Sequence, residues 1–381
     1  MNPTAQAMPA FDHNVLAALS GRSLFTTNEW STDALETLLN VAAIFQQADF
    51  RKRSLAMLPD ELAYGLFFDN STRTRSAWAG GAARLGMRPV ISDGSSTQVS
   101  HGETPYETGA MLGMNAHALG VRHDKVLGEG NVFIREMKRG IDDYLKSTGD
   151  SRNVPIVNLQ CDVDHPTQAL ADFQYLRDVF PGGVKGKRIA MSWAYSPSYA
   201  KPLSVAQGVC TLFTRFGADV VLAHPEPYRI MDESLAAAQK HARESGGSFK
   251  VVHSMDEAFT GADVVYPKSW GPYDLMLERV DANRARDNKR MTDIEQRALT
   301  QNAKFKDWIC DERRMGLTKG GKALYMHPLP ADIGDEVSTG VMEKAKLDVA
   351  RQANKKMYVI MAMLAVAKMP DLARRLEDLR A

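Results

Sequence analysis

Residues 62–75 read LAYGLFFDNSTRTR, an apolar run that stops at Asp69 and is followed by a cluster of hydroxyl and guanidinium side chains. An apolar run of this length that ends in Asp-Asn indicates a buried strand followed by a turn. Residues 74–85 are rich in alanine and arginine and predict a helix directly after the turn. A strand that leads into a helix is the repeating unit of parallel α/β domains, so this stretch favours that fold class.

Strand and helix patterns alternate along the rest of the chain in the same way. We predict further strands at residues 89–91, 118–121, 188–193, 219–222, 250–252, 263–266 and 323–326, and a long polar loop at 92–104. Predicted helices cover about 35–44, 166–178, 203–213 and 231–242, a polar stretch at 281–302, and a long final segment at about 342–379 that is interrupted near Pro370. The sequence therefore predicts two doubly wound parallel-sheet domains with a boundary near residues 150–180, and ligands at the carboxyl ends of their strands.

Composition limits the classes of partner. The 381 residues include 47 Lys and Arg against 46 Asp and Glu, which gives a net charge of +1. A near-neutral chain is a poor candidate for coating nucleic acid or an anionic membrane, so we expect neither as a partner. The hydrophobic content of 44% and charged content of 24% exclude disordered and fibrous classes. A small anion site is still compatible with these numbers, because a few arginines can gather locally.

The cysteines and the apolar segments indicate the compartment. Cys161, Cys210 and Cys310 are far apart and form no CxxC pair, so we expect no disulfide framework, no zinc site and a reducing, cytoplasmic setting. Residues 1–14 lack the basic and apolar regions of a signal peptide. The longest apolar stretch, Met357–Ala367, is too short for a membrane span of about 20 residues and predicts a buried helix. We therefore expect a soluble, intracellular protein.

The hydroxyl and arginine cluster after the first strand is the sharpest local feature. Ser71, Thr72, Arg73 and Thr74 lie where a strand turns into a helix, so backbone N–H groups are free and the helix dipole is positive there. Hydroxyl and forked guanidinium donors add to these groups, which predicts an anion site of the phosphate kind. The alternative is a plain helix N-cap with solvated arginines. The density of donors favours the anion site.

Three further features lie where predicted helices begin or predicted strands end. His165-Pro166-Thr167-Gln168 opens a helix, where the dipole should lower the pKa of His165 and leave a neutral ring that can polarise a carbonyl. Arg122 follows another strand, and His327-Pro328-Leu329-Pro330 follows a third, with prolines that leave carbonyl oxygens free for a ligand. The alternatives are a structural cap histidine and ordinary loops.

Two sequence patterns are similar to cofactor-binding sites, but neither meets the requirements of such a site. Cys161, Asp162, Asp164 and His165 match no common zinc pattern, so we expect no metal. Residues 316–323 have the spacing of a phosphate-binding G-x-x-x-x-G-K loop, but Ala323 stands where Ser or Thr is needed, and the loop precedes its strand. There is no G-x-G-x-x-G. We therefore expect no nucleotide or dinucleotide cofactor.

Residues 71–75, Arg122, 165–168 and 327–330 together resemble the aspartate/ornithine carbamoyltransferase family, in its order and spacing over nearly the whole chain. The resemblance implies a carbamoyl-phosphate-binding domain at residues 1–160 and a second-substrate domain at 161–344. A C-terminal helix at about 345–381 would pack back on the first domain. It also implies a homotrimer with active sites at subunit interfaces, and a reaction that needs no cofactor.

Finer matches are to the knotted branch of the family. Residues 192–203 resemble the proline-containing loop through which the chain threads in that branch, so the second domain is expected to be knotted. Residues 263–270 and 100–104 resemble the YgeW-type members. Because true knots are rare, this expectation depends on the resemblance alone.

The resemblance implies transfer of the carbamoyl group of carbamoyl phosphate to an amino or amide nitrogen. Ser71, Thr72, Thr74 and Arg73 would hold the phosphate, while Arg122, His165 and Thr74 would be catalytic through the carbonyl oxygen. Gln168 and the carbonyls of Pro328 and Leu329 would hold the NH2 group. A non-catalytic carbamoyl-phosphate-binding paralogue with a regulatory or assembly role is the alternative.

The acceptor is where this chain departs from the family. Pro328 stands where ornithine enzymes have Cys, and Ala331-Asp332 stand where aspartate enzymes continue with Arg, so neither amino acid is the expected acceptor. The second-substrate candidates are Lys268, Ser269 and Trp270, with His101 from the next subunit in place of the family's lysine; the alternative for Lys268 is a solvated strand end. A lysine suits a carboxylate, which predicts a small anionic acceptor. The resemblance suggests oxamate or a ureido or diamino acid of purine breakdown.

Overall fold

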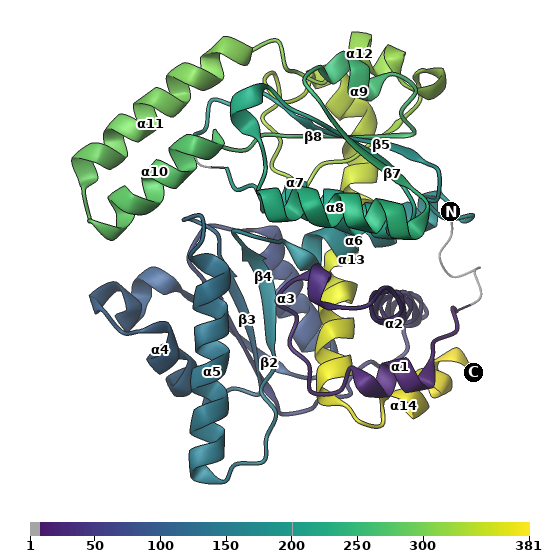
Figure 1. Ribbon diagram of the computed structural model, residues 1–381. Helices are drawn as coiled ribbons and strands as arrows, with labels where there is room; N and C mark the ends of the chain where they lie inside the picture. The colour runs from purple at the N-terminus through teal and green to yellow at the C-terminus, as the bar shows by residue number, and fades with distance from the viewer. Residues whose placement is uncertain (1–7, 200) are drawn as a thin grey trace.

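The computed structural model describes residues 8–199 and 201–381, and within them the chain forms two α/β domains, one above the other in Figure 1. Residues 1–7 and Ala200, which belongs to the predicted threading loop, lie outside the described residues. The first sheet contains β1 (Leu62–Phe67), β2 (Arg88–Asp93), β3 (Ala118–His123) and β4 (Ile156–Cys161) in the order β2-β1-β3-β4, all parallel. The second contains β5 (Arg188–Trp193), β6 (Asp219–Ala223), β7 (Ser248–Val252), β8 (Val264–Lys268) and β9 (Leu324–Tyr325) in the order β7-β6-β5-β8-β9, also all parallel. The predicted pair of parallel-sheet domains is confirmed.

The strand orders determine where a ligand can lie. In the first sheet the chain goes from β1 to β2 on one side and returns to β3 on the other, so the order reverses between β1 and β3. In the second sheet the reversal falls between β5 and β8. Connections leave such points in opposite directions and open a crevice at the carboxyl ends of the strands.

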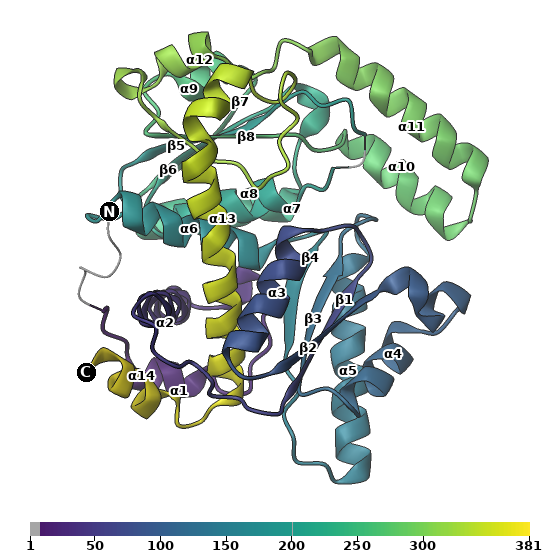
Figure 2. The same ribbon diagram turned by 180° about the vertical axis from the view of Figure 1, so that it is seen from behind.

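Helices cover both faces of the first sheet. Figure 2 shows α3 (Arg73–Arg84) on one face, and α4 (Pro105–Gly113) and α5 (Gly130–Thr148) on the other. The apolar stripe of α5 (Phe133, Ile134, Met137, Ile141 and Leu145) is buried. Glycines allow α4 and α5 to approach closely, because a Cβ at Gly109 would lie 2.1 Å from the Met137 carbonyl oxygen and one at Gly140 would lie 2.0 Å from that of Tyr106.

The second domain carries α7 (Ser204–Arg215), α8 (Asp232–Ser245), α9 (Met255–Phe259) and α12 (Glu312–Leu317) around its sheet. A two-helix hairpin, α10 (Tyr273–Arg284) and α11 (Asn288–Asn302), projects to one side in Figure 1 and has a small apolar core of its own. The polar, helical stretch predicted at 281–302 is helical except for the turn that separates α10 from α11. The chain turns at Arg286, whose φ is +52°, and the Asp287 carboxylate accepts the Arg290 N–H to cap α11.

Among the described helices, α6 (Pro166–Val179) and α13 (Thr339–Lys368) connect the two domains, and α2 (Thr32–Phe50) packs against both of them. Figure 2 shows α13 running the height of the molecule. The chain breaks at Pro370 before α14 (Leu372–Arg380), which contacts α1 (His13–Ala18). Residues 358–367 of α13 are all buried, so the helix predicted there is confirmed. Among the described helices, none combines the length and the apolar character that crossing a bilayer requires.

Candidate active site

A cavity of about 510 Å³ lies between the domains, at the carboxyl ends of strands from both sheets. Its walls follow both points at which the strand order reverses, as expected for a binding crevice. Five cationic side chains line it against one carboxylate, that of Asp69; the cations are Arg73, Arg122, Lys201, Lys268 and Lys356. Two other cavities, of about 560 and 610 Å³, are larger, but their walls carry cations and carboxylates in nearly equal number. The excess of positive charge favours the smaller cavity over the other two as the candidate anion site.

The two arginines after β1 point in different directions. Ser71 caps α3 by accepting the Thr74 N–H at 3.2 Å, and Thr72 stands at the N-cap position without a side-chain bond. The Arg73 guanidinium lines the cavity and donates to the Leu329 carbonyl of the other domain. Burial, and then Arg122, lower its pKa. Arg75 instead pairs with the exposed Asp93. Only Arg73 is therefore available to a ligand.

Arg122 is fixed in place by a carboxylate behind it. Its Nε and Nη2 donate to the two oxygens of the buried Asp124 at 3.1 and 2.9 Å, and Nη2 lies 3.7 Å from Asp69. A guanidinium held bidentately has little freedom, so its remaining donors keep one direction. They face the cavity that Arg122 lines.

His165 caps the start of α6 and is buried, with Nε2 3.4 Å from the Lys356 Nζ and Nδ1 3.5 Å from the Thr167 hydroxyl. Burial holds its pKa well below the usual value, and the charges of Lys356, Arg122 and Arg73 add to this effect. The expected neutral imidazole agrees with the structure. Its main cause is burial, which the sequence argument from the helix dipole did not include.

Lys356 on α13 was not predicted from sequence. Its Nζ is 3.2 Å from the Thr74 hydroxyl, and burial together with Arg73 lowers its pKa to about 7. The neighbouring Lys355 points away, to Asp178 and to the Gln46 amide oxygen at 2.5 Å. Two adjacent lysines before a long apolar helix segment were the available signal, since a buried lysine needs a partner or a function.

Gln168 is oriented by a buried carboxylate. Its amide nitrogen donates to Asp172 at 2.6 Å, and Asp172 also accepts from the Gln352 amide at 2.6 Å and the Tyr266 hydroxyl at 2.7 Å. Burial raises the pKa of Asp172 even though it accepts three hydrogen bonds. With the nitrogen engaged in this way, the side-chain oxygen is the part of Gln168 that can accept a bond from a ligand.

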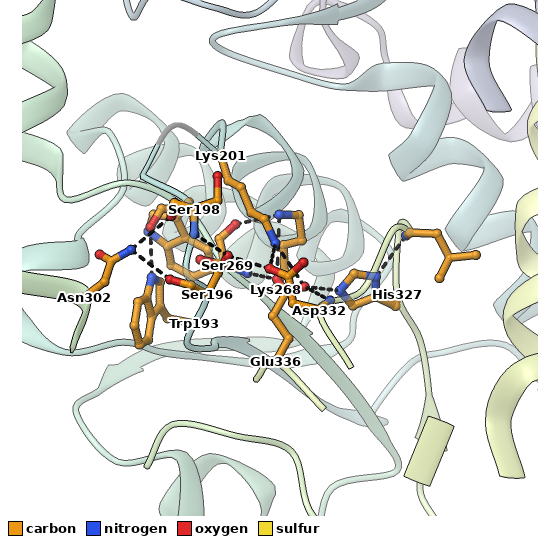
Figure 3. Close-up of polar contacts among 12 residues, drawn as sticks. Trp193, Ser196, Ser198, Lys201, Lys268, Ser269, Asn302, His327, Asp332 and Glu336 are labelled. Atoms are coloured by element: carbon orange, nitrogen blue, oxygen red, sulfur yellow. Dashed lines mark hydrogen bonds and ion pairs between the residues drawn. The ribbon is translucent and has the colours of Figure 1, made fainter. Parts of the chain in front are cut away.

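A second polar cluster, shown in Figure 3, includes Lys201 and Lys268, which both line the cavity. Lys201 Nζ lies 2.6 Å from Asp332 and 3.1 Å from Glu336. Lys268 Nζ donates to the Ser269 carbonyl at 2.6 Å and lies 4.0 Å from Glu336. The sequence indicated Lys268 but gave no signal for Lys201, Asp332 or Glu336.

Glu336 connects the segments of this cluster. It is fully buried and accepts the backbone N–H groups of Ser269 at 2.6 Å and Asp332 at 2.9 Å. Its carboxylate also lies 3.4 Å from His327 Nε2. Burial opposes its ionisation, but His327, Lys268 and Lys201 outweigh this and hold the pKa of Glu336 well below the usual range.

The structure brings most of the predicted site residues together and leaves three outside the cavity wall. Those that line it are Ser71, Thr72, Arg73, Thr74, Arg122, His165, Gln168, Lys268, Pro328 and Leu329. Ser269 contributes its backbone N–H to Glu336, and Trp270 is buried with its indole N–H on the Tyr228 carbonyl at 2.8 Å. His101 lies in a short 3₁₀ helix, Gln98–His101, and is exposed.

Comparisons with known proteins agree with this geometry. Residues 22–178 match the family model described as "Aspartate/ornithine carbamoyltransferase, carbamoyl-P binding domain", and residues 201–367 match "Aspartate/ornithine carbamoyltransferase, Asp/Orn binding domain". The Escherichia coli K12 protein "Putative carbamoyltransferase YgeW" is 44% identical over 96% of this chain and 95% of its own length. N-acetylornithine carbamoyltransferase of Xanthomonas campestris pv. campestris is 30% identical over 91% of this chain and 98% of its own.

Solved structures show the same fold. Ornithine carbamoyltransferase from Pyrococcus furiosus superposes with a TM-score of 0.74 at 25% identity, covering 92% of this chain and 98% of its own. A mutant of N-acetyl-L-ornithine transcarbamylase complexed with carbamyl phosphate and N-succinyl-L-norvaline also gives 0.74, at 26% identity over 90% of this chain and 98% of its own.

Proposed function

The chain belongs to the aspartate/ornithine carbamoyltransferase family and is a carbamoyltransferase, and on that premise we propose which residues hold its two substrates and what kind of acceptor it uses. The observation that carries the proposal is the charge of the interdomain cavity, five cations against one carboxylate. Carbamoyl phosphate is a dianion, which neutralises two of these charges.

The phosphate of the donor binds at the start of α3. The N–H groups of the first helical turn have no partner within the helix, and Ser71, Thr72 and Thr74 add hydroxyl donors beside them. Arg73 pairs with the phosphate oxygens from inside the cavity. The leaving phosphate is thus held as an anion before the bond to it breaks.

The carbonyl oxygen of the donor lies among Arg122, His165, Thr74 and Lys356. Negative charge grows on this oxygen as the acceptor nitrogen attacks, and donors fixed in advance stabilise it. Removing one such donor typically costs about 3 kcal/mol of barrier height. The Gln168 side-chain oxygen and the carbonyls of Pro328 and Leu329 accept from the donor's NH2 group, which orients the carbon for attack.

The acceptor binds at the far end, at Lys268 and Lys201. Lys201 is the cation at this end that binds a carboxylate, so the acceptor carries a carboxylate next to its amino or amide nitrogen. Ser269 and Trp270 support this wall from behind, and His101 reaches it from a neighbouring subunit. Oxamate and ureido or diamino acids have this chemistry. Curated relatives named for ornithine and N-acetylornithine are only about 30% identical, so their acceptors are not carried over.

A phosphate-release assay with carbamoyl phosphate and a panel of acceptors tests the proposal. The panel contains oxamate, small ureido and diamino acids, L-aspartate, L-ornithine and N-acetyl-L-ornithine. We expect turnover with a member that combines one carboxylate and a nearby nitrogen, and none with its neutral methyl ester. Turnover of the ester at an equal rate would show that the lysines do not bind a carboxylate. No observation favours the non-catalytic alternative.

Four further expectations belong to the same proposal. Residues 1–160 form the donor domain, 161–344 form the acceptor domain, and about 345–381 pack back on the first. The active assembly is a homotrimer, and the location is cytoplasmic. The second domain is knotted at 192–203, a proposal that depends on the resemblance of this loop to that of the knotted branch.

A further inference from the structure

The two lysines at the acceptor end of the cavity have different partners. Lys201 lies 2.6 Å from the Asp332 carboxylate and 3.1 Å from the Glu336 carboxylate, so it has two carboxylates as partners. Lys268 donates to a neutral carbonyl, that of Ser269, at 2.6 Å, and its nearest carboxylate oxygen is 4.0 Å away (Figure 3). The carboxylate of Glu336 is already occupied by two backbone N–H groups and Lys201.

The surroundings of Lys268 make its ammonium form less stable than that of an exposed lysine. The residue is only 8% exposed, and burial is the main reason that its pKa falls to about 8. Glu336 and Asp332 oppose this fall, while Lys201 and Arg122 add to it. His327, on the other side of Glu336, has its own pKa lowered by burial and contributes no charge when neutral. A lysine in this setting can bind a proton and release it near neutral pH.

The position of Lys268 places it in the wall of the proposed substrate cavity. It is the last residue of β8, beside the point where the strand order reverses, and it lines the cavity. Its charge interacts with that of Arg122, which holds the donor's carbonyl oxygen in the proposed complex. Lys201 belongs to the loop after β5 and is paired with the Asp332 carboxylate from the segment after β9.

We propose that Lys268 takes the proton from the attacking nitrogen of the acceptor, that Lys201 binds the acceptor's carboxylate, and that Glu336 is the positioning residue for both lysines. This inference rests on the proposed function. The nitrogen lone pair forms the bond to the carbamoyl carbon, and the bond from that carbon to the phosphate oxygen breaks. The N–H proton passes to neutral Lys268, which then returns it to the leaving phosphate or to water, so no oxidant or further reactant is needed.

Substitutions at the two lysines separate their roles. Lys268→Arg keeps a positive charge but removes the base, because a guanidinium is not deprotonated near neutral pH. We expect kcat to fall at least about a hundredfold with little change in KM for the acceptor. Lys201→Gln, the matched control, should raise KM for the acceptor at least about tenfold and change kcat little. If Lys268→Arg instead keeps kcat and raises only KM, Lys268 binds the carboxylate and the proposal is wrong.

The Glu336→Gln variant tests whether Glu336 acts on Lys268 through its charge. If Glu336 had a purely structural role, the pH dependence of kcat would not shift. The negative charge of Glu336 raises the pKa of Lys268, so removing it should lower that pKa further. The acid limb of the kcat profile, where Lys268 gains its proton, should therefore move from near pH 8 to lower pH. A loss of activity with an unmoved limb would limit Glu336 to a structural role and overturn that part of the proposal.

Potassium cyanate provides a test that needs no acceptor. Cyanate carbamoylates neutral amines, so mass spectrometry across a pH series reports the protonation of each lysine. Lys268 should be modified at lower pH than Lys240, whose side chain is 65% exposed, and at still lower pH in Glu336→Gln. Modification of Lys268 at the same pH as Lys240 would overturn the inference. A failure of the proposed function appears elsewhere, as wild-type protein that releases no phosphate with any member of the panel.

Discussion

Arg73 carries more than one role, because it belongs to the anion site and also spans the cavity. Its guanidinium starts on α3 in the first domain and donates to Leu329 in the second. A cation that is buried beside Arg122 is costly without an anion, as its lowered pKa indicates. The burial of Arg73 therefore lowers the stability of the protein without its ligand, which is typical of a residue in a binding site.

Arg73→Ala should weaken carbamoyl phosphate binding about a hundredfold, since it removes charge-assisted hydrogen bonds worth about 1.5–3 kcal/mol. Isothermal titration calorimetry with carbamoyl phosphate measures this loss. Arg75→Ala is the matched control, because Arg75 pairs with exposed Asp93 on the outside and should leave the affinity within about twofold. Equal losses for the two variants would contradict the assignment of the phosphate to Arg73.

Helix α13 shows how one element serves stability and binding through adjacent residues. Lys355 contacts Asp178 on α6 and Gln46 on α2, and so it links α13 to both of these helices. Lys356 points the other way, to Thr74 and His165 in the cavity. Both lysines are 3% exposed, so burial alone does not distinguish them.

Substituting the two lysines by methionine should therefore give opposite results. Lys356→Met should weaken carbamoyl phosphate binding at least about tenfold and leave the melting temperature unchanged or higher, because it removes a cation that Arg73 and Arg122 repel. Lys355→Met should lower stability by about 1 kcal/mol, through lost hydrogen bonds, and leave donor affinity unchanged. Calorimetry and thermal unfolding on both variants provide the measurements. A Lys355→Met variant with the greater loss of affinity would reverse these roles.

Most helices and strands could be predicted from the sequence, because apolar runs and turn residues mark them within a short stretch of the chain. Strand β4 was not predicted, since Asn158 and Gln160 interrupt its apolar pattern. Both are buried, and Asn158 donates to the Phe25 carbonyl at 2.6 Å. Helix α5 was also missed, although its apolar stripe is regular.

Site residues next to a predicted strand or helix could be identified from the sequence. Site residues that reach the cavity only because distant segments fold together were missed. Ser71–Thr74 and Arg122 directly follow predicted strands, and His165 directly precedes a predicted helix. Lys356 meets Thr74 across 282 residues, and Glu336 meets Ser269 across 67. No local pattern encodes such contacts, so Lys201, Asp332, Glu336 and Lys356 required the fold.

One predicted site residue has no role within a single chain. His101 is exposed at the end of its 3₁₀ helix and is not among the residues that line the cavity. It follows β2, the edge strand of the first sheet, where Val90 is 40% exposed. An unpaired strand edge with an exposed apolar side chain is a surface that another chain can cover. This arrangement is consistent with the proposed homotrimer, in which His101 completes a neighbour's cavity.

Mixing two inactive variants tests this arrangement. Arg73→Ala subunits lack the donor site and His101→Ala subunits lack the residue supplied to a neighbour, so each pure trimer should have little activity. After the subunits are dissociated and reassembled in equal amounts, about one quarter of the sites should combine an intact Arg73 with a neighbour's intact His101. We therefore expect about a quarter of the wild-type phosphate release, measured with the best acceptor of the panel. If His101 acted within its own chain, every site would lack one residue and mixing would restore nothing. If His101 had no role, the His101→Ala protein would be fully active before mixing. Sedimentation of each sample confirms that reassembly occurred, so a failure to exchange subunits is recognised as such.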